Sequence, residues 1–449
     1  MRVSAERKEI PDKWYNVIPD LRFPMAPMMG PSGYPAGEHD LGPLMASSTA
    51  DQELEREKRE MAIPEEVRDL YSNWRPTPLY RAERFEESLK TPARIFYKYE
   101  GGNPSGSHEM NTAIAQAYYA SQDKGVKRMV TATGNGEWGQ SLAIACNYFG
   151  LKCKVYMVRS SYEQRANGRY AMEILGAEVV PSPSDNTRTG KEVLAQKPDS
   201  PGSLSTALSE AFEEAVTHDD IKLSWGTVMN HVVLHQTIIG LEAKSQMRRA
   251  DAEPDIIISA VGGGSGFGGL VLPFYRNLRQ GMRMLAVETA SAPSLCKGRY
   301  AYDHADAEGL SPMLKMYTLG RSFVPSGVCA GGMGYHGISP IISALYREKE
   351  IEAKAYTQRQ AFEAAIAFAR TEGVIPSPES SYAERAVMDE ALACKDSKER
   401  KDILFLLDAN SNLDLAAFRD FVEGAIGDEP FPEGEVQMAL EQLPDVKSE

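Results

Sequence analysis

A glycine-rich segment is the clearest candidate for chemistry in this chain of 449 residues. Val261 ends an apolar run and is followed by Gly262, Gly263, Gly264 and Ser265, after which a helical pattern begins. Glycines let the backbone approach a ligand closely, and the N–H groups of such a loop converge with a helix N-terminus on an anion. The segment therefore predicts a cup that binds a phosphate or another anion.

The same segment fits two other interpretations. Gly264, Gly266 and Gly269 match the spacing G-x-G-x-x-G, and Glu288 ends the next strand pattern, where a dinucleotide fold places its ribose-binding acid. A turn that needs glycine only for packing is the other alternative. Three consecutive glycines followed by serine exceed what such a turn requires, so we favour the anion cup.

The elements around this segment alternate between strand and helix from residue 94 onward. The strand candidates are residues 128–131, 154–158, 255–261, 284–288 and 402–407. Alternation of this kind predicts an α/β fold with parallel sheets and helices on both faces. Ligands of such sheets bind beyond the carboxyl ends of the strands, which is where the glycine-rich segments fall.

Composition narrows the function further. A hydrophobic content of 42% with 25% charged residues predicts a globular chain with two domains. The net charge of −14 argues against a nucleic-acid partner, and no apolar run approaches the ~20 residues that span a bilayer. We therefore expect a cytoplasmic protein without a membrane partner. Five cysteines without CxxC spacing suit reduced thiols.

Several segments distributed along the chain resemble one family, the tryptophan synthase β chains, and most closely their second-type, stand-alone subgroup. These segments are residues 10–17, 73–79, 97–113, 230–237, 314–320 and 370–373. The resemblance implies the fold type II pyridoxal-phosphate architecture: two parallel-sheet, three-layer α/β domains, a mobile subdomain in the N-terminal half, and a homodimer. It also covers His231 and His235, whose i, i+4 spacing could suggest a metal, and implies that no metal binds there.

The chain departs from this family at the positions where the resemblance places the chemistry. Glu109 follows His108, where the resemblance implies the lysine that forms a Schiff base with pyridoxal phosphate. Ala132 stands where it implies a catalytic glutamate, and residues 408–411 replace a Ser-Gly-His-Gly segment. A carboxylate forms no imine, so these replacements predict that no cofactor is bound covalently and that no Schiff base is possible at Glu109.

The residues that replace the expected ones could transfer protons. We expect Glu109 to act as general acid or base, with Asp408 as a second carboxyl and His108 as neighbour. Glu137 and Glu372 would join them, and like charges raise the pKa of some members of such a cluster. The structural alternatives are a helix-start acid for Glu109, favoured by ~0.3–1 kcal/mol, a turn cap for Asp408 and a packing role for His108.

The predicted contacts to an anionic small-molecule substrate extend beyond the glycine cup. They are Gly262, Gly263, Gly264, Ser265, Asn111, Thr133, Gly134, Asn135, Gly136, Glu137 and Glu372.

Three functions remain open from the sequence. The first is an enzyme independent of pyridoxal phosphate, a lyase, isomerase or cyclase that carries out elimination, isomerisation or cyclisation of an aromatic or isoprenoid substrate bearing phosphate, diphosphate or carboxylate. The second is a pseudoenzyme that regulates or pairs with an authentic β chain. The third is residual tryptophan synthase activity on serine and indole. The replaced residues favour the first.

We expect four segments along the chain. They are an irregular N-terminal extension at residues 1–62, an N-terminal α/β domain at 63–226, a C-terminal α/β domain with the glycine loop at 227–428, and an acidic tail at 429–449.

Overall fold

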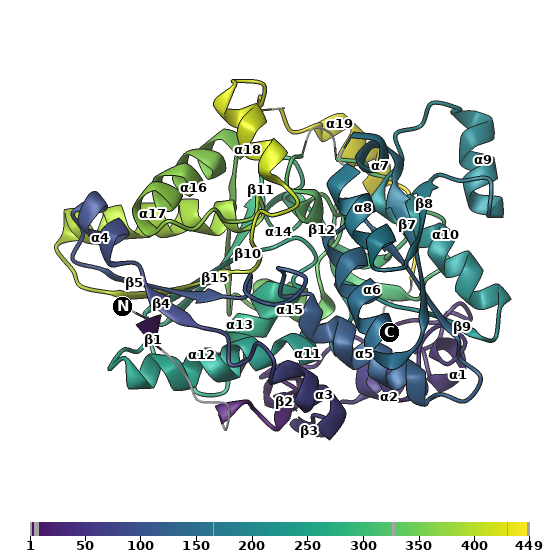
Figure 1. Cartoon of the computed structure of the whole chain (residues 1–449), viewed down its shortest axis with the longest axis horizontal. Coiled ribbons are helices and arrows are strands. Elements are labelled where there is room, and N and C mark those ends of the chain that lie inside the picture. Colours follow the sequence, from purple (N-terminus) through teal and green to yellow (C-terminus); the bar gives the residue numbers. More distant parts are fainter. Residues whose placement is uncertain (1, 4–8, 165, 326–327, 429, 447–449) are drawn as a thin grey trace.

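The computed structural model describes residues 2–3, 9–164, 166–325, 328–428 and 430–446. Its larger sheet has seven strands (Figure 1). In spatial order they are β1 (Arg2–Val3), β4 (Leu79–Arg81), β5 (Arg94–Tyr99), β15 (Asp402–Leu407), β10 (Ile256–Ala260), β11 (Arg283–Thr289) and β14 (Glu352–Tyr356). The five strands from β5 to β14 are parallel, whereas β1 and β4 are antiparallel at one edge.

Helices cover both faces of this sheet (Figure 1). On one side lie α12 (Ile238–Arg249) and α13 (Ser265–Tyr275), and on the other lie α16 (Gln358–Glu372) and α17 (Ser380–Ser397). All six residues of β15 are buried between them. A strand that is covered on both faces has no polar side, which explains its continuous apolar run.

The smaller sheet is fully parallel. In spatial order its strands are β8 (Glu178–Ser182), β7 (Lys152–Val158), β6 (Arg128–Thr133) and β9 (Ile221–Leu223). Helices α6 (Glu137–Phe149) and α8 (Ala166–Ile174) lie on one side and α10 (Leu204–Thr217) on the other (Figure 1). The expected α/β class with parallel sheets is therefore confirmed, and each predicted strand region contains a strand.

The remaining elements connect or flank these layers. The short strand pairs are β2 (Lys13–Tyr15) with β3 (Glu60–Ala62) and β12 (Arg299–His304) with β13 (Met313–Thr318). The other helices are α1 (Glu38–Leu41), α2 (Ser47–Leu54), α3 (Glu65–Tyr71), α4 (Glu83–Leu89), α5 (Met110–Gln122), α7 (Arg159–Gln164), α9 (Arg188–Gln196), α11 (Asn230–Gln236), α14 (Ser294–Lys297), α15 (Pro340–Arg347), α18 (Leu415–Val422) and α19 (Glu433–Leu440).

Segments near both ends of the described chain pack against the rest of the protein through buried apolar side chains. Near the N-terminus, Trp14 and Leu41 are fully buried. Near the C-terminus, Val436 of α19 packs in one cluster with Leu319 and Phe323. Burial of apolar side chains stabilises both segments against the body of the protein.

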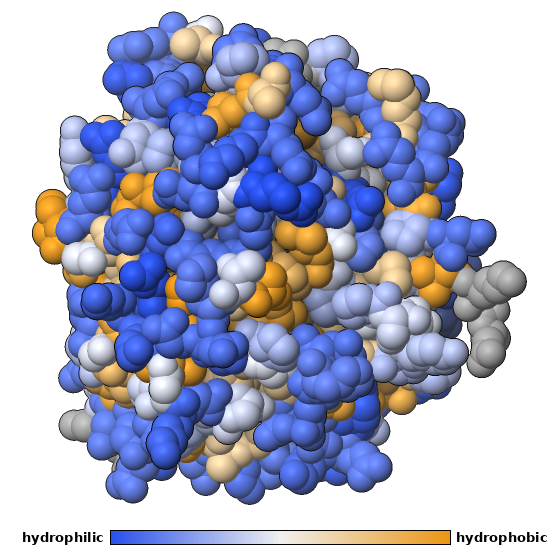
Figure 2. Space-filling model, turned by 90° about the vertical axis from the view of Figure 1, so that its right-hand side faces the viewer, coloured by the Kyte–Doolittle hydropathy of each residue, from blue (hydrophilic) through white to orange (hydrophobic). Residues whose placement is uncertain are grey.

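The sheets do not divide the chain at residue 227. Strands β4 and β5 precede the smaller sheet in the sequence but belong to the larger one. The face in Figure 2 is mostly hydrophilic, with hydrophobic residues in small groups between polar ones. Of the helices in the described ranges, none combines the length and the apolar character that crossing a membrane requires.

Candidate functional site

A pocket lies where the ends of strands from both sheets meet. Residues that follow β6 in the smaller sheet line one part of it, and residues that follow β10 and β15 in the larger sheet line another. Ligands of parallel sheets usually bind beyond the carboxyl ends of the strands, because the loops and helix N-termini that follow the strands converge there.

The glycine cup, residues 262–265, forms one end of the pocket. Among the described residues, the backbone N–H groups of Gly262, Gly263 and Gly264 find no acceptor. The loop is held in place instead through its carbonyl oxygen at Gly263, which accepts the N–H of Ser339 at 2.9 Å. Helix α13 begins at Ser265, so its positive end adds to these donors. The cup is thus suited to a phosphate.

Glycine is required in the cup by close packing. A Cβ at Gly262 would lie 2.0 Å from the carbonyl oxygen of Gly332, and a Cβ at Gly263 would lie 2.1 Å from Oγ1 of Thr227. Gly264 has a φ of 99°, a conformation that other residues rarely adopt. A larger residue at these positions would move the loop, so the donors depend on the glycines.

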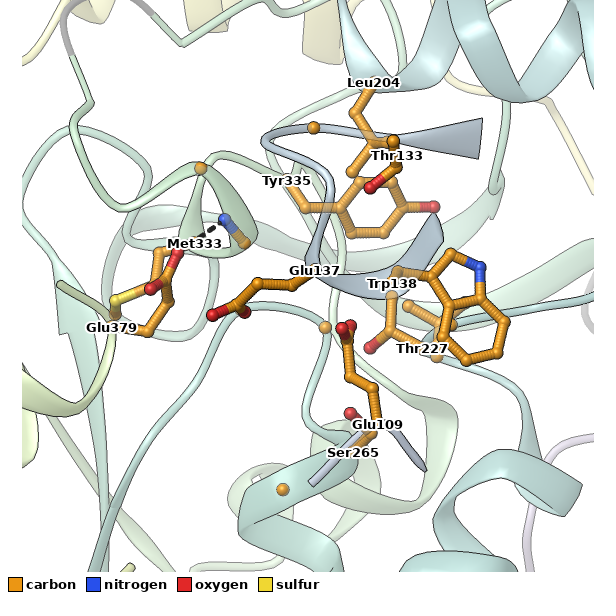
Figure 3. A pocket seen from close by; sticks show the side chains of 18 of the residues that line it. Glu109, Thr133, Glu137, Trp138, Leu204, Thr227, Ser265, Met333, Tyr335 and Glu379 are labelled. Carbon is orange, nitrogen blue, oxygen red and sulfur yellow. Dashed lines mark hydrogen bonds between the residues drawn. The ribbon is translucent and has the colours of Figure 1, made fainter. Parts of the chain in front are cut away.

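Carboxyl groups line another part of the pocket. Their acidic character contrasts with the N–H donors of the cup. We call Glu109, Glu137 and Glu379 the acidic wall. Glu109 directly precedes α5, Glu137 is the first residue of α6, and Glu379 directly precedes α17. Figure 3 shows the carboxyl of Glu137 between those of Glu379 and Glu109. A helix N-terminus favours a carboxylate, which explains in part how three acids are tolerated together.

The acidic wall holds protons near neutral pH. Burial, with the charges of Glu379 and Asp408, raises the pKa of Glu109 to about 8. Burial, with the charge of Asp414, raises the pKa of Glu379 to about 8, although the N–H of Gly332 opposes this shift. The pKa of Glu137 is raised well above its usual range for the same reasons. Glu109 and Glu379 can therefore donate or accept a proton in the neutral range.

Asp408 also lines the pocket, but it has hydrogen-bond partners of its own. Its Oδ1 accepts the hydroxyl of Ser377 at 3.1 Å and that of Ser380. Its backbone oxygen accepts the N–H of His108 at 2.8 Å. These bonds fix the carboxyl and make it a weaker candidate for proton transfer than Glu109, whose Oε2 is buried without a partner.

His108 connects the acidic wall with the cup. Its Nε2 lies 3.4 Å from Oγ of Ser265, and its Nδ1 is buried without a partner. Burial lowers the pKa of His108, so the ring is neutral at pH 7 and can accept or donate one hydrogen bond. It brings no positive charge to a phosphate.

The pocket brings together most of the predicted contacts. His108, Glu109, Glu137 and Asp408 line it, as do Thr133, Gly134, Asn135 and the glycine cup. Gly136 does not line it, because it packs against Gly168.

Two predicted site residues lie elsewhere. The Oε1 of Glu372 accepts the N–H of Phe85 at 2.8 Å and so caps α4. Asn111 is buried behind the pocket, where its Oδ1 accepts from the guanidinium of Arg75 at 2.9 Å and its amide donates to Gln236 at 2.9 Å. The structure therefore does not bring these two residues to the pocket, because a helix directs neighbouring polar residues to different faces.

Sequence reasoning missed several lining residues. Glu379, Trp138, Thr227 and Tyr335 are among them (Figure 3). The only signal for Glu379 was its place just before a helical pattern, after Pro376 and Pro378. The aromatic and hydroxyl residues carried no signal in their spacing.

No lysine or arginine is found among the described residues that line the pocket. The buried Lys98 is engaged elsewhere: its Nζ lies 2.7 Å from Glu242 and 2.9 Å from Oε1 of Gln246. Lys315 lies over the rings of Tyr300 and Tyr302. Neither offers an amine to the cup.

Glu288 and the two histidines that the sequence singled out have partners within the protein. Both Oε atoms of Glu288 accept backbone N–H groups, from Leu295 at 2.7 Å and Cys296 at 3.0 Å, so this acid caps α14. The two histidines are held by protein groups, with Nδ1 of His231 2.7 Å from Glu53 and Nε2 of His235 2.8 Å from Gln52. Within the described ranges, no group of three or more metal-ligating side chains is placed to hold a metal.

Comparison with known proteins identifies the family. The sequence profile described as "Pyridoxal-phosphate dependent enzyme" matches residues 70–408, more than half of the chain. The chain belongs to this family. The expected fold type II class, with α/β layers built on parallel sheets, is therefore confirmed.

Relatives within the family are similar over nearly the whole chain. Tryptophan synthase beta chain 2 of Aquifex aeolicus is 49% identical over 427 residues, which cover 94% of this chain and 98% of the relative. The protein of the same name from Methanosarcina mazei is 47% identical over 429 residues, covering 95% and 97%.

Solved structures of the same fold are more distant. A fungal L-serine ammonia-lyase from Rhizomucor miehei matches with a TM-score of 0.58 at 16% identity, covering 77% of this chain and 97% of that one. The processed form of threonine deaminase isoform 2 from Solanum lycopersicum matches with a TM-score of 0.57 at 17% identity, covering 77% and 82%. They show the fold alone.

The comparisons overturn two expectations drawn from Glu109. An enzyme independent of pyridoxal phosphate, acting as a lyase, isomerase or cyclase, conflicts with the family and with relatives named tryptophan synthase beta chain. The expectation of a site without covalently bound pyridoxal phosphate conflicts with the same findings. Both predictions were wrong because they gave one side chain more weight than the cup, whose backbone donors do not depend on residue 109.

Proposed function

We propose that this protein is a tryptophan synthase β-type enzyme that uses pyridoxal phosphate to join serine and indole. The observation that carries the proposal is the similarity to chains named tryptophan synthase beta chain, at 47–49% identity over 94–95% of this chain. Similarity of this extent covers nearly the whole length of the chain and of each relative.

The pocket fits the phosphate end of this cofactor. The glycine cup offers N–H groups that find no acceptor among the described residues, and the first turn of α13 adds its positive end. Ser265 and His108 provide further polar atoms beside it. When bound, pyridoxal phosphate supplies an electron sink that stabilises negative charge on the carbon beside an amino group.

The carboxyl groups of the acidic wall line another part of the pocket. Glu109 occupies the position that the resemblance assigns to the cofactor's lysine, and Ala132 the position that it assigns to a catalytic glutamate. We infer that Glu109 holds the mobile proton at its Oε2, which has no other partner. Because a carboxyl is a weaker base than an amine, we expect slow turnover.

The test measures tryptophan formed from serine and indole by purified protein with added pyridoxal phosphate. Glu109→Lys combined with Ala132→Glu supplies both side chains that the resemblance assigns, and we expect the rate to rise ~10²–10⁴-fold. Glu372→Lys is the matched control, because it adds a lysine outside the pocket. If neither the parent protein nor the double variant forms tryptophan while both bind pyridoxal phosphate, the proposal fails.

The lack of lysine among the lining residues favours one second candidate, a catalytically silent chain that regulates an authentic β chain. Mixing the two purified chains distinguishes this role. A changed rate of the authentic chain, together with no activity of this protein alone, would favour regulation over catalysis.

A further inference from the structure

The pocket has two chemically opposite ends. The glycine cup presents N–H donors and the positive end of α13, whereas the acidic wall presents three carboxyl groups from three other helix starts. A ligand that matches both ends carries negative charge at one end and positive charge at the other.

Two carboxyl oxygens of the acidic wall are placed to accept a hydrogen bond from a ligand. Glu379 is only 7% exposed, and its Oε2 finds no hydrogen-bond partner among the described residues, although its Oε1 accepts the N–H of Gly332 at 2.9 Å. The Oε2 of Glu109 is also buried, with no partner in the part of the chain that the structure describes. Buried polar atoms are nearly always satisfied, so two such oxygens facing one cavity indicate a ligand group that donates to them.

Among the described residues that line the pocket, no cation faces these carboxyls. The groups that face Glu109 are Glu137 from α6, Glu379 from the start of α17, Asp408 after β15 and the neutral His108. Asp414, before α18, adds a further negative charge near Glu137 and Glu379. An ammonium group in this space would replace the missing cation.

We propose that the pocket takes a phosphorylated amine, with the phosphate in the glycine cup and the ammonium group against the acidic wall, and that it prefers pyridoxamine 5′-phosphate to the corresponding aldehyde. The inference rests on the proposed function for the place of the phosphate. It goes beyond that function, because it assigns specificity for the amine form to Glu109 and Glu379.

Three compounds share the same ring and the same phosphate and differ in one substituent. Comparing their affinities isolates the contribution of the ammonium group. Pyridoxamine 5′-phosphate carries the ammonium, pyridoxine 5′-phosphate carries a neutral hydroxyl at the same place, and pyridoxal 5′-phosphate carries the aldehyde. Because hydrogen bonds to charged groups are about twice as strong as neutral ones, we expect the amine to bind about 10-fold more tightly than the alcohol.

Proton release provides a second, independent signal. The carboxyls of the empty wall are largely protonated at pH 7, since the pKa of Glu109 and that of Glu379 are raised to about 8. An ammonium favours their ionised form, so its binding expels a proton and its affinity rises from pH 6 to pH 8. The alcohol lacks this dependence on the acidic wall.

The experiment is calorimetric titration of the full chain with each compound, in two buffers of different ionisation enthalpy. Glu109→Gln and Glu379→Gln keep the shape of the side chain but remove its charge, and we expect each to reduce the preference for the amine to less than about threefold. Glu372→Gln is the matched control, because this acid lies outside the pocket and can still cap α4 through its oxygen.

Each outcome decides one question. A preference for the amine that both pocket variants abolish and the control retains supports the inference. Equal or weaker binding of the amine than of the alcohol or the aldehyde overturns it and leaves the proposed function intact. If none of the three compounds binds, while melting curves show all proteins folded, the inference and the proposed phosphate site fail together.

Discussion

The Nε2 atom of His108 lies 3.4 Å from the Oγ atom of Ser265, although the two residues are 157 positions apart in the sequence. His108 lies before α5 and Ser265 begins α13, so this contact joins the acidic wall to the glycine cup. A change at Ser265 therefore acts on both ends of the pocket.

Ser265→Asp places a negative charge in the cup. We expect affinity for inorganic phosphate or pyridoxal phosphate to fall at least about 10-fold, because like charges then face each other at the start of α13. Ser265→Ala removes only the hydroxyl and is the control, with an expected loss of about threefold. Titration by calorimetry measures both. Unchanged affinity in the aspartate variant would show that the anion binds elsewhere.

Gly262→Ala tests the packing of the cup. The added Cβ would lie 2.0 Å from the carbonyl oxygen of Gly332, so the loop has to move. We expect a loss of stability of about 1–3 kcal/mol and weaker phosphate binding. Gly427→Ala is the control, since nothing lies within 4 Å of its added Cβ. Chemical denaturation measures the difference, and equal stability of the two variants would contradict the expectation.

Glu109→Gln tests the raised pKa of this carboxyl. The folded protein holds the proton to about pH 8, whereas the unfolded chain releases it near its ordinary value of 4.5. Rising pH between these values therefore favours the unfolded chain, and this group's contribution to stability falls. We expect the variant to be more stable than the parent at pH 8 by on the order of 1–3 kcal/mol, with little difference near pH 4.

The melting temperatures of parent and variant across this pH range check the prediction, with Glu372→Gln as the comparison outside the pocket. A constant difference between parent and variant from pH 4 to pH 8 would show that Glu109 titrates normally.

Glu242→Gln tests a buried ion cluster behind the pocket. The Oε2 of Glu242 lies 2.8 Å from Arg75 and 2.7 Å from Lys98, and all three side chains are 0–1% exposed. Removing this carboxylate leaves buried cations under-compensated, so we expect a loss of roughly 3–5 kcal/mol in unfolding free energy. Glu60→Gln, whose partner Lys13 is exposed, is the control and should cost less than about 1 kcal/mol. Similar losses for both would contradict the role of burial.

The sequence predicted the fold class and the position of the glycine loop, because both depend on local patterns. The apolar run at residues 402–407 became β15, buried at all six positions, and the glycines after β10 became the cup. Both signals come from backbone geometry and from burial on two faces, and both survive replacement of single side chains.

The acids of the pocket could be predicted only in part. Glu109 and Glu137 face it as expected, but Glu372 ends α16 and caps α4, while Glu379, seven positions later, lines the pocket. The chain turns between α16 and α17, and the direction of that turn depends on packing against the sheet. Sequence periodicity does not extend across such a turn.

The predicted function was wrong because it rested on a few replaced positions, residues 109, 132 and 408–411. Those positions can change without altering the rest of the chain, which is 47–49% identical to its relatives. The backbone donors of the cup are a property of the whole fold.

The walls of the pocket come from two sheets. Thr133 ends β6 and Glu137 follows it, whereas Gly262 and Asp408 follow β10 and β15. A molecule that binds there contacts both layers and opposes their separation. The free energy of binding therefore adds to the free energy that holds the two sheets together. Amide hydrogens of β6 and of α13 should then exchange more slowly with solvent deuterium by the same factor, although they belong to different layers.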